Sequence, residues 1–298
     1  MIRCDELTKY FNGTRALENC SFEITGPTLT GVIGVNGAGK TTLFKSLAGF
    51  LKPTGGEAFV LDQPAFQNIS VAQNVMLLEE GMRFYTSAGL KELMDSYNRF
   101  YQNFDLKLAL GLLKYFNLNE NSKYHSLSKG MSSTFRLILA LSARAPITLL
   151  DEPTSGMDPG VRKDLYEIIL KDYIKAPRII LISSHYLGEM EQILQDILFI
   201  HEGKVLKHGA LEEFETLMIA LQASPSVIRP LEELLTVYEA KDFGEGLRRI
   251  VVSKEDFEAL PHSVSLKEQL TLQGISPEES FVYLTRRKGG GIDELYNS

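Results

Sequence analysis

The stretch that decides the fold is Gly34-Val-Asn-Gly-Ala-Gly39-Lys40-Thr41, which satisfies the pattern GxxxxGK[ST]. It follows the short apolar run Thr28–Ile33 (TLTGVI) and precedes Leu43–Leu51, whose apolar positions recur at helical spacing. A strand, a glycine-rich loop and a helix in this order form a phosphate loop, because successive backbone N–H groups and the positive end of the helix face the same anion. The stretch therefore predicts a nucleotide-binding site.

Several residues of this loop are candidates for holding phosphate. Lys40 can reach the β- and γ-phosphates of a nucleoside triphosphate, and the Thr41 hydroxyl can bind Mg²⁺. The full set of predicted nucleotide-binding residues in the loop is Asn36, Gly37, Ala38, Gly39, Lys40, Thr41 and Thr42. A nucleoside triphosphate with Mg²⁺ is therefore the expected ligand of this loop.

A second segment supplies carboxylates. The buried-strand pattern Ile147–Leu150 (ITLL) runs directly into Asp151 and Glu152. Carboxylates at the carboxyl end of a strand can meet a phosphate loop across a parallel sheet. We expect Asp151 to hold Mg²⁺ through water and Glu152 to polarise the water that attacks the γ-phosphate. Alone, this segment could equally be an acidic surface turn, and the phosphate loop favours the catalytic interpretation.

Beyond these segments, strands alternate with helices. Val161–Tyr173 is a predicted helix and Arg178–Ser183 (RIILIS) a predicted buried strand, a succession typical of a three-layer α/β sheet. Residues 70–119 are predicted to be largely helical and to form a helical core, with a partner-docking face as the alternative. Their aromatic residues are Phe84, Tyr85, Tyr97, Phe100, Tyr101, Phe104, Tyr115 and Phe116.

The last quarter of the chain has a different composition. Residues 1–210 carry 22 acidic and 22 basic side chains, whereas residues 211–298 carry 16 and 9, which accounts for the whole net charge of −7. Here we expect helices at Glu212–Gln222 and Pro230–Val237, strands at Arg248–Val252 and Phe281–Leu284, and a flexible tail over RRKGGGIDELYNS. The acidic balance argues against a nucleic-acid partner.

No apolar run approaches the roughly 18 residues that span a bilayer. The nearest, Leu137–Leu150, is interrupted by Arg144. Cys4 and Cys20 have no metal-site spacing and do not make a disulfide framework. These features are typical of a protein of the reducing cytoplasm.

Three further motifs complete a resemblance. LSKGM (127–131) resembles the LSGGQ signature of ATP-binding-cassette (ABC) ATPases, LLDEPTSGMDP (149–159) resembles their Walker B and D-loop run, and SSHYLGEME (183–191) resembles their switch-histidine segment. With the phosphate loop, four ordered motifs cover about residues 1–215. The chain is most similar to the ATPase subunits of bacterial drug, antibiotic-peptide or lantibiotic exporters, and EESFVYLTR (278–286) supports that subgroup.

The resemblance implies an α/β fold: a P-loop NTPase core of ABC type with an inserted helical subdomain and a small α+β C-terminal extension. The ABC domain would span residues 1–215, its helical subdomain residues 68–128, and an accessory region with a flexible tail residues 216–298. Two copies would close head to tail around ATP, with Ser128 and the Gly130 backbone contacting the γ-phosphate of the other copy. His185 would contact the γ-phosphate, and Asp158 would couple the two sites as well as serve as a helix N-cap.

The resemblance also implies an aromatic stack on adenine. It assigns Phe11 to this role, with Tyr10 as its rival and a core role as the alternative for either ring.

The pattern departs from the family in two places. A strand hairpin before the Q-loop, whose glutamine contacts Mg²⁺, is expected to be missing. Gln63 is the first choice for that glutamine and Gln67 the second, unless either is a loop residue. Lys129 stands where the signature usually has glycine, which would add positive charge near the other copy's phosphate.

The resemblance thus predicts an ATP-hydrolysing subunit that powers export of a drug, antibiotic or peptide. It would lie on the cytoplasmic face of the membrane beneath separate transmembrane permease subunits, paired with itself or with a related ATPase, and would bind no nucleic acid. The alternatives are a nucleotide-gated regulatory or sensing subunit with weak hydrolysis and an ABC ATPase acting on nucleic acid or ribosomes.

Overall fold

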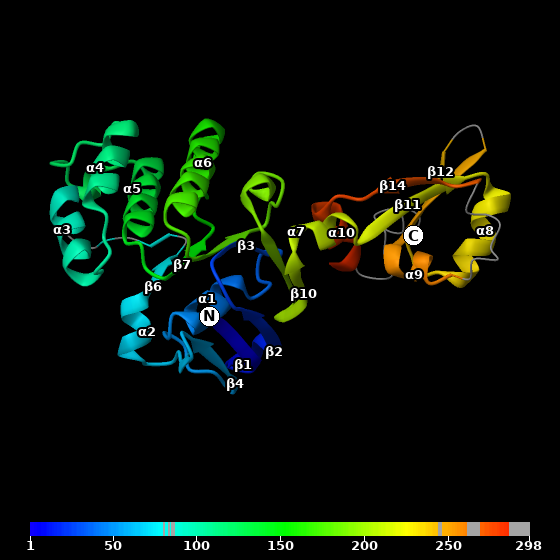
Figure 1. Cartoon of the computed structure of the whole chain (residues 1–298), viewed down its shortest axis with the longest axis horizontal. Coiled ribbons are helices and arrows are strands. Elements are labelled where there is room, and N and C mark those ends of the chain that lie inside the picture. Colours follow the sequence, from blue (N-terminus) through cyan, green and yellow to red (C-terminus); the bar gives the residue numbers. More distant parts are fainter. Residues whose placement is uncertain (80, 83, 85–86, 244–245, 261–268, 286–298) are drawn as a thin grey trace. The chain divides into compact units, whose positions relative to one another are not determined.

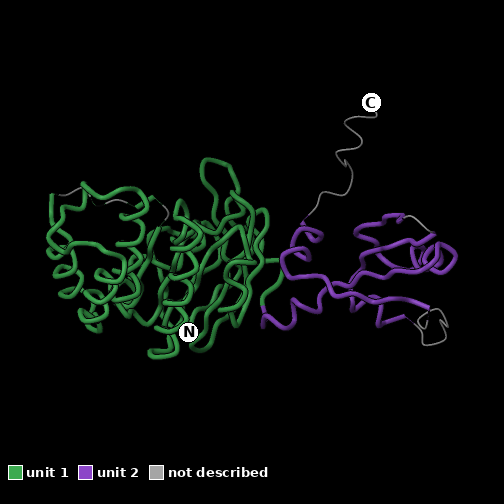
Figure 2. Tube along the Cα trace, turned by 90° about the horizontal axis from the view of Figure 1, so that it is seen from above, with its two compact units in different colours: residues 1–208 green, residues 209–298 purple. Residues whose placement is uncertain are grey.

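The computed structural model describes residues 1–79, 81, 82, 84, 87–243, 246–260 and 269–285. The chain divides into two compact units, Met1–His208 and Gly209–Ser298 (Figure 2). The division falls before the boundary at residue 215 that the sequence predicts. The reason is that helix α7 (Leu211–Glu215) packs against helix α10 (Pro277–Thr285) of the second unit.

A six-stranded sheet forms the centre of the first unit (Figure 1). Its strands are, in spatial order, β10 (Lys204–Ala210), β9 (Asp196–His201), β3 (Thr28–Ile33), β8 (Ile179–Ser184), β7 (Ile147–Asp151) and β6 (Val75–Leu78). The pairings from β9 through β3, β8 and β7 to β6 are parallel. Every residue of β3, β6, β7 and β8 is buried, which explains their nearly continuous apolar sequences.

Strand β6 corrects the prediction that residues 70–119 are largely helical. Its sequence VMLL is too short for its periodicity to distinguish a buried strand from a helix turn. Pairing with β7 decides the matter, because Val75 lies opposite Ile147 and Leu78 opposite Leu150. The carboxyl ends of β6 and β7 therefore lie next to each other.

A second, antiparallel sheet has the order β2-β1-β4-β5. Its strands are β1 (Ile2–Phe11), β2 (Thr14–Ile24), β4 (Gly55–Val60) and β5 (Gln63–Pro64). Leu61 and Asp62 both have positive φ, as a two-residue hairpin turn requires, and connect β4 to β5. The expectation of a missing hairpin is therefore wrong: the hairpin is present, with a very short second strand.

The apolar core of the first unit joins the two sheets to the helix after the phosphate loop. Leu43, Phe44 and Leu47 of helix α1 (Lys40–Leu47) pack in one cluster with Leu149 of β7 and residues of β1, β2 and β4. Phe44 is completely buried. This packing holds the start of α1, and with it the phosphate loop, against the core sheet.

The remaining helices of the first unit complete its layers. They are α2 (Ile69–Asn74), α3 (Leu90–Phe100), α4 (Leu106–Tyr115), α5 (Lys129–Ser142) and α6 (Pro159–Lys175), with short 3₁₀ turns at Tyr124–Ser126 and Glu191–Ile193. Figure 1 shows α3, α4 and α5 grouped together. Asp105 accepts a hydrogen bond from the Leu108 N–H and is therefore the N-cap of α4.

Aromatic rings link the helical group internally. Phe84 makes edge contacts with Tyr97 and Tyr124, and Tyr97 lies beside Tyr101. Burial raises the pKa of Tyr97 to about 12 and also raises the pKa of Tyr101. These rings form a helical core, while Phe100 stays 55% exposed and suits a docking face. Tyr85 lies outside the described residues.

The second unit contains a four-stranded antiparallel sheet in the order β12-β13-β11-β14. Its elements are β11 (Met218–Ala223), α8 (Pro225–Leu234), β12 (Val237–Phe243), β13 (Leu247–Ser253), α9 (Lys254–Glu258) and β14 (Thr271–Gly274). This βαββαβ succession, with its first and third strands adjacent at the centre, is the ferredoxin-like arrangement. One core lies between the sheet and α8 with α9, and a smaller one lies on the opposite face beside α10.

Two sequence predictions for this unit are wrong. The predicted strand Phe281–Leu284 is part of helix α10, where Phe281 is buried and Leu284 packs against the smaller core. The predicted helix Glu212–Gln222 ends after one turn, because Met218 begins the central strand β11. The predicted tail, residues 286–298, lies outside the described residues. Within the described ranges, no helix has both the length and the apolar character needed to cross a membrane.

Candidate active site

The phosphate loop connects β3 to α1 and has a left-handed backbone at two glycines. Gly37 and Gly39 have φ of 81° and 111°. A Cβ at Gly39 would also lie 2.6 Å from the carbonyl oxygen of Ala16, so only glycine fits there. The Lys40 side chain is buried and donates a hydrogen bond from Nζ to the Gly34 carbonyl at 2.6 Å. The loop is therefore closed around its own lysine.

Asp151 lies at the carboxyl end of β7, directly across from this loop. It is 1% exposed, and both of its carboxylate oxygens accept hydrogen bonds from hydroxyls. Thr41 Oγ1 donates to Oδ2 at 2.6 Å, and Ser183 Oγ donates to Oδ1 at 2.6 Å. Two strands and one helix N-terminus thus fix the orientation of a single buried carboxylate.

Glu152 follows in a left-handed backbone conformation, with φ of 46°. Its carboxylate lies 3.3 Å from Lys40 Nζ, and His185 Nδ1 lies 3.1 Å from the same group. His185 comes from the loop after β8 and is 39% exposed. The structure therefore brings Lys40, Glu152 and His185 together, with Asp151 and Thr41 beside them.

The oxygen atoms at this edge suit a magnesium ion. Mg²⁺ prefers oxygen ligands and is usually held by one or two carboxylates together with substrate phosphates and water. Thr41 and Asp151 supply a hydroxyl and a buried carboxylate 2.6 Å apart. Among the described residues, no three His, Cys, Asp or Glu side chains are grouped to hold a metal alone. The residues present therefore fit a metal that is completed by a nucleotide.

A cavity of about 430 Å³ opens at the phosphate loop. Its lining residues in the described chain are Thr14, Arg15, Ala16, Asn36, Gly37, Ala38, Gly39, Lys40, Thr41, Thr42, Asp151 and Glu152. All seven predicted loop residues line it. Phe11, which is not among these lining residues, ends β1 directly before the Asn12–Gly13 turn to Thr14. It is 43% exposed and has Lys9 Nζ 5.0 Å from its ring centre. Tyr10 is 39% exposed on the same strand.

The signature residues lie away from this cavity. Ser128 is the N-cap of α5 and accepts from the Met131 N–H at 3.2 Å. A Cβ at Gly130 would meet nothing within 4 Å, so the helix start is open. Neither Ser128 nor Gly130 is among the described residues that line the phosphate-loop cavity. Asp158 is the N-cap of α6, with no side-chain hydrogen bond to that helix.

The structure does not place the two predicted Q-loop glutamines at the site. Gln63 forms part of the hairpin strand β5, where its side-chain oxygen accepts from Asn68 Nδ2 at 3.1 Å. Gln67 precedes α2 and donates its N–H to the Gly49 carbonyl. Neither residue is among the described lining of the phosphate-loop cavity or of the neighbouring cavity. The placement of Gln63 is a correction, and its cause is the hairpin that the sequence analysis omitted.

Glu79 is a residue of the candidate site that the sequence analysis does not predict. It follows β6, forms an ion pair with Lys45 of α1 at 2.8 Å, and lines a cavity of about 570 Å³ together with Asp151 and Glu152. The signal was available, because an apolar run followed by two acids occurs both at VMLLEE and at ITLLDE. Glu80 lies outside the described residues.

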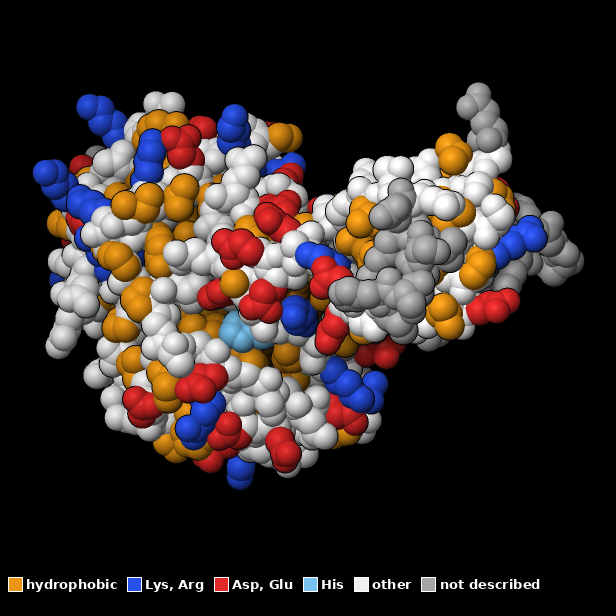
Figure 3. All heavy atoms as spheres, turned by 45° about the vertical axis from the view of Figure 1, so that its right-hand side comes forward, with side chains coloured by type: hydrophobic (Ala, Val, Ile, Leu, Met, Phe, Trp, Pro, Cys, Tyr) orange, Lys and Arg blue, Asp and Glu red, His pale blue; other side chains and the backbone are white. Residues whose placement is uncertain are grey.

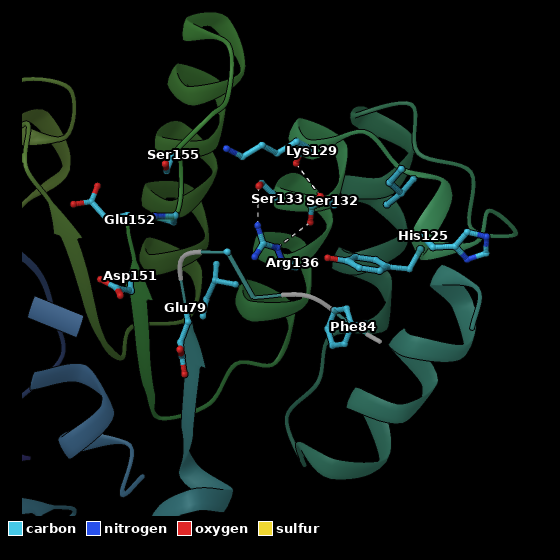
Figure 4. Close-up of a pocket in the computed structure, with 15 residues that line it drawn as sticks. Glu79, Phe84, His125, Lys129, Ser132, Ser133, Arg136, Asp151, Glu152 and Ser155 are labelled. Carbon is cyan, nitrogen blue, oxygen red and sulfur yellow. Dashed lines mark hydrogen bonds between the residues drawn. The ribbon is translucent and has the colours of Figure 1, made fainter. Parts of the chain in front are cut away.

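The same cavity reaches the start of α5 (Figure 4). Lys129 extends toward the loop that contains Ser155, and a Cβ at Gly156 would lie 3.3 Å from Lys129 Cε. Arg136 is nearly buried and donates hydrogen bonds to the Met82 carbonyl and to Ser133 Oγ. Lys129 therefore lies over a loop of its own chain, which was not expected from the sequence.

The parallel core sheet, the phosphate loop and the acidic strand end define a P-loop nucleoside triphosphatase. A family model described as ABC transporter matches residues 17–155. The chain is 31% identical over 219 residues to the uncharacterized ABC transporter ATP-binding protein YcbN of Bacillus subtilis, covering 72% of this chain and 70% of that protein. The chain belongs to the ABC transporter family of ATP-binding proteins, and its first unit is an ABC ATPase domain.

Two other comparisons agree. The bacitracin transport ATP-binding protein BcrA of Bacillus licheniformis is 29% identical, over 70% of this chain and 69% of that protein. A solved structure of the ATP-binding subunit of an ABC transporter superposes with a TM-score of 0.65 at 24% identity, covering 72% of this chain and 92% of that one. The likeness in structure supports the α/β P-loop fold predicted from the sequence.

Proposed function

We propose that this chain hydrolyses ATP to drive export of a drug, antibiotic or peptide through separate transmembrane permease subunits. The observation that carries the proposal is the convergence of Lys40, Asp151, Glu152 and His185 at one edge of the core sheet. The similarity to a bacitracin transport protein supports an antibiotic or a peptide as the cargo.

Lys40 and Glu152 would exchange partners when nucleotide binds. Lys40 Nζ lies between the Gly34 carbonyl and the Glu152 carboxylate, which hold it at the phosphate loop. Arriving β- and γ-phosphates compete for the ammonium group, which frees Glu152 to accept a proton from the attacking water. His185, in contact with Glu152, would then turn its ring toward the γ-phosphate.

Thr41 and Asp151 would hold Mg²⁺ as part of the nucleotide complex. The metal, when bound, neutralises charge on the β- and γ-phosphates. Asp151 is already oriented by two hydroxyls, so its carboxylate needs little rearrangement. Asn36, Gly37, Ala38, Gly39 and Thr42, which line the cavity, would direct their N–H groups at the phosphates. Phe11, at the exposed end of β1, would stack on adenine.

Ser128 and Gly130 would contact ATP bound to a second chain. Their helix start is open and lies outside the phosphate-loop cavity of the same chain, which supports a contact in trans. A helix N-terminus that faces solvent is a ready anion site. The partner would be another copy or a related ATPase subunit, and Asp158 would lie at the junction of the two sites.

The membrane subunits would dock on the helical subdomain, residues 68–128, and on the apolar surface beside it. Phe50 is 62% exposed and Ile69 is 76% exposed. This position would keep the chain peripheral on the cytoplasmic face of the membrane. Nucleic acid is not a proposed partner, because residues 1–210 carry equal numbers of acidic and basic side chains, interspersed on the face seen in Figure 3.

The decisive test replaces Glu152 with glutamine in the full chain. Glu152→Gln keeps the shape and removes the base, so steady-state phosphate release should fall below detection while ATP binding persists and the ATP-bound dimer accumulates. Glu189→Gln, an exposed carboxylate paired with Arg162, is the matched control and should leave the rate unchanged. Hydrolysis by Glu152→Gln at the rate of the unmodified chain would overturn the assignment. A chain that binds ATP and hydrolyses none even with its permease would instead support a sensing subunit.

A further inference from the structure

Ser183, the first residue of the SSHYLGEME segment, has been given no role so far, although its hydroxyl bonds both Asp151 and the backbone of Glu152. It is the fifth residue of β8 and is completely buried. In the parallel register it lies opposite Asp151 on one side and opposite Val32, just before the phosphate loop, on the other. A serine hydroxyl this deeply buried in the sheet needs hydrogen-bond partners.

Both partners of that hydroxyl come from the acidic strand end. Ser183 Oγ donates to Asp151 Oδ1 at 2.6 Å and accepts from the Glu152 N–H at 2.9 Å. One hydroxyl can do both, because it has one donor hydrogen and two acceptor lone pairs. The side chain therefore ties the orientation of the Asp151 carboxylate to the backbone of the next residue.

That backbone is held in a conformation that glutamate rarely adopts. Glu152 has φ of 46°, in the left-handed region that favours glycine. Such residues persist only where their surroundings hold them. The bond from the Glu152 N–H to Ser183 supplies part of that hold, and the turned backbone directs the Glu152 side chain toward Lys40 and His185.

The Thr41 hydroxyl, which also bonds Asp151, cannot orient this carboxylate during turnover. Thr41 Oγ1 donates to Asp151 Oδ2 in this structure, but in the function proposed above it is a Mg²⁺ ligand. The hydroxyl of Ser184, the next residue, bonds the backbone of Tyr186 and not the Asp151 carboxylate. Ser183 is thus the hydroxyl that stays available to orient Asp151 when nucleotide and metal are bound.

We propose that Ser183 is a positioning residue for ATP hydrolysis, which sets the metal-binding carboxylate of Asp151 and the base Glu152 through one hydroxyl. The inference rests on the proposed function of those two residues. Ser183 would not touch the nucleotide, so its loss should lower the turnover rate and weaken Mg²⁺ activation while leaving ATP affinity nearly intact. Partners that orient metal ligands typically change metal affinity or activity by about 10–100-fold when removed.

The experiment compares Ser183→Ala with a matched control, Ser142→Ala, in the full chain. Ser142 is equally buried but lies at the end of α5, away from the carboxylates. We expect Ser183→Ala to lower kcat by about 10–100-fold, to raise the Mg²⁺ concentration for half-maximal rate, and to leave the KM for ATP within about threefold. Ser142→Ala should change none of the three. Unaltered kcat and Mg²⁺ dependence in Ser183→Ala would overturn the proposal, as would an equal loss in both variants.

A pair of isosteric variants keeps the proposal falsifiable if Ser183→Ala does not fold. Ser183→Thr and Ser183→Val have the same shape and suit a strand, but only threonine keeps the hydroxyl. A rate for Ser183→Thr at least about tenfold above that of Ser183→Val supports the proposal, and equal rates overturn it. Glu152→Gln, measured in parallel, separates the two levels: if it retains activity, the proposed function fails, whereas its inactivity beside a fully active Ser183→Ala rejects only the role of Ser183.

Discussion

The catalytic edge of the core sheet and the sheet of the second unit treat their charged residues in opposite ways. At the catalytic edge, Asp151 is 1% exposed and Lys40 is 6% exposed. In the second unit, the Arg248 side chain is 20% exposed and pairs with Glu232 and Asp242 at the sheet margin. Charges are deeply buried where phosphate must bind, and they lie near the surface where only a small fold must hold together.

The difference has a physical cause. Burying a charge is unfavourable unless it is paired and hydrogen-bonded, so a buried acid such as Asp151 is weak evidence for stability. Partly exposed pairs contribute little to stability in either direction. The two regions should therefore respond in different ways to substitution. We expect changes at the catalytic edge to lower activity with little loss of stability, and changes in the apolar core of the second unit to lower stability with little loss of activity.

The largest expected effect is that of Asp151→Asn. The amide keeps the volume but loses the charge and cannot accept a hydrogen bond at its nitrogen, so it serves poorly as a metal ligand. We expect hydrolysis to fall on the order of 10³-fold, equivalent to about 4 kcal/mol of transition-state stabilisation. Thermal unfolding without nucleotide should not move downward, because a buried charge has been removed. A strongly destabilised variant that retained its rate would reverse the comparison.

The second effect concerns the core of the second unit. Ile250 is completely buried between the sheet and its two helices, and Ile250→Ala should lower the free energy of unfolding of that unit by about 2–5 kcal/mol. Leu234→Ala, at a side chain that is 63% exposed, is the control and should change it by less than about 0.5 kcal/mol. Hydrogen exchange of the amides of β11 and β13 measures both, and ATP hydrolysis should stay within about twofold. Equal effects at the two positions would contradict the assigned core.

These two regions also differ in how far the sequence predicts them. At the catalytic edge, the local patterns suffice: the loop Gly34–Thr41 and the acids after ITLL are each short segments, and the parallel sheet brings their ends together. The same reasoning missed Glu79, because residues 70–119 were assigned a helical period and β6 has only four residues. The predicted Q-loop role of Gln63 differs from the structure for a similar reason, because Gln63 belongs to the β4–β5 hairpin, which the sequence pattern does not indicate.

In the second unit, local patterns mislead. Phe281 and Leu284 are spaced for one face of a helix, but the run FVYL has the β-branched and aromatic character of a strand. The sheet consists of β12, β13, β11 and β14, and the segment packs as helix α10 against the core on one face of it. Tertiary packing determines the secondary structure of such segments, and no local sequence motif predicts that packing. The proposed role of Ser183 is not predictable from a local pattern for a related reason, since it depends on the register of β8 with β7.

We expect a smaller effect from the charged residues around Glu239 in the second unit. Here the free energy of unfolding should depend on pH. Burial tends to raise the pKa of Glu239, but hydrogen bonds from Lys241 and Tyr283 and the charges of Lys241 and Arg249 outweigh it and hold the pKa below its ordinary value. The folded state therefore binds its proton less readily than the unfolded state. The stabilisation is complete above the ordinary carboxyl range and is lost as the pH falls through the lowered pKa.

Glu239→Gln tests this point. At pH 7 we expect a loss of about 1 kcal/mol in the free energy of unfolding of the second unit, and at about pH 3, below the ordinary glutamate range, a much smaller difference from the unmodified chain. Glu233→Gln, at an exposed residue of α8, is the control and should change the free energy of unfolding by less than about 0.5 kcal/mol at both pH values. Urea unfolding at the two pH values measures the difference. A loss that is equally large at both would show that packing, and not charge, holds Glu239.

The smallest effect, and the one that best sharpens the comparison, is expected at Lys129. This cation stands at the first turn of α5, where it opposes the helix dipole by about 0.3–1 kcal/mol, and its stem lies over Gly156 of its own chain. Lys129→Ala should therefore leave the free energy of unfolding within about 0.5 kcal/mol. Because Lys129 is exposed, we also expect half-saturation by ATP to change less than about threefold, the equivalent of about 0.65 kcal/mol. Lys123→Ala, at an exposed lysine of the same helical subdomain, is the control.

If Lys129→Ala weakened ATP binding tenfold, and high salt weakened ATP binding by the unmodified chain to the same level, the Lys129 charge would act on nucleotide held by a second chain. The charge at the start of α5 would then contribute to nucleotide binding, as the charges of the catalytic edge do.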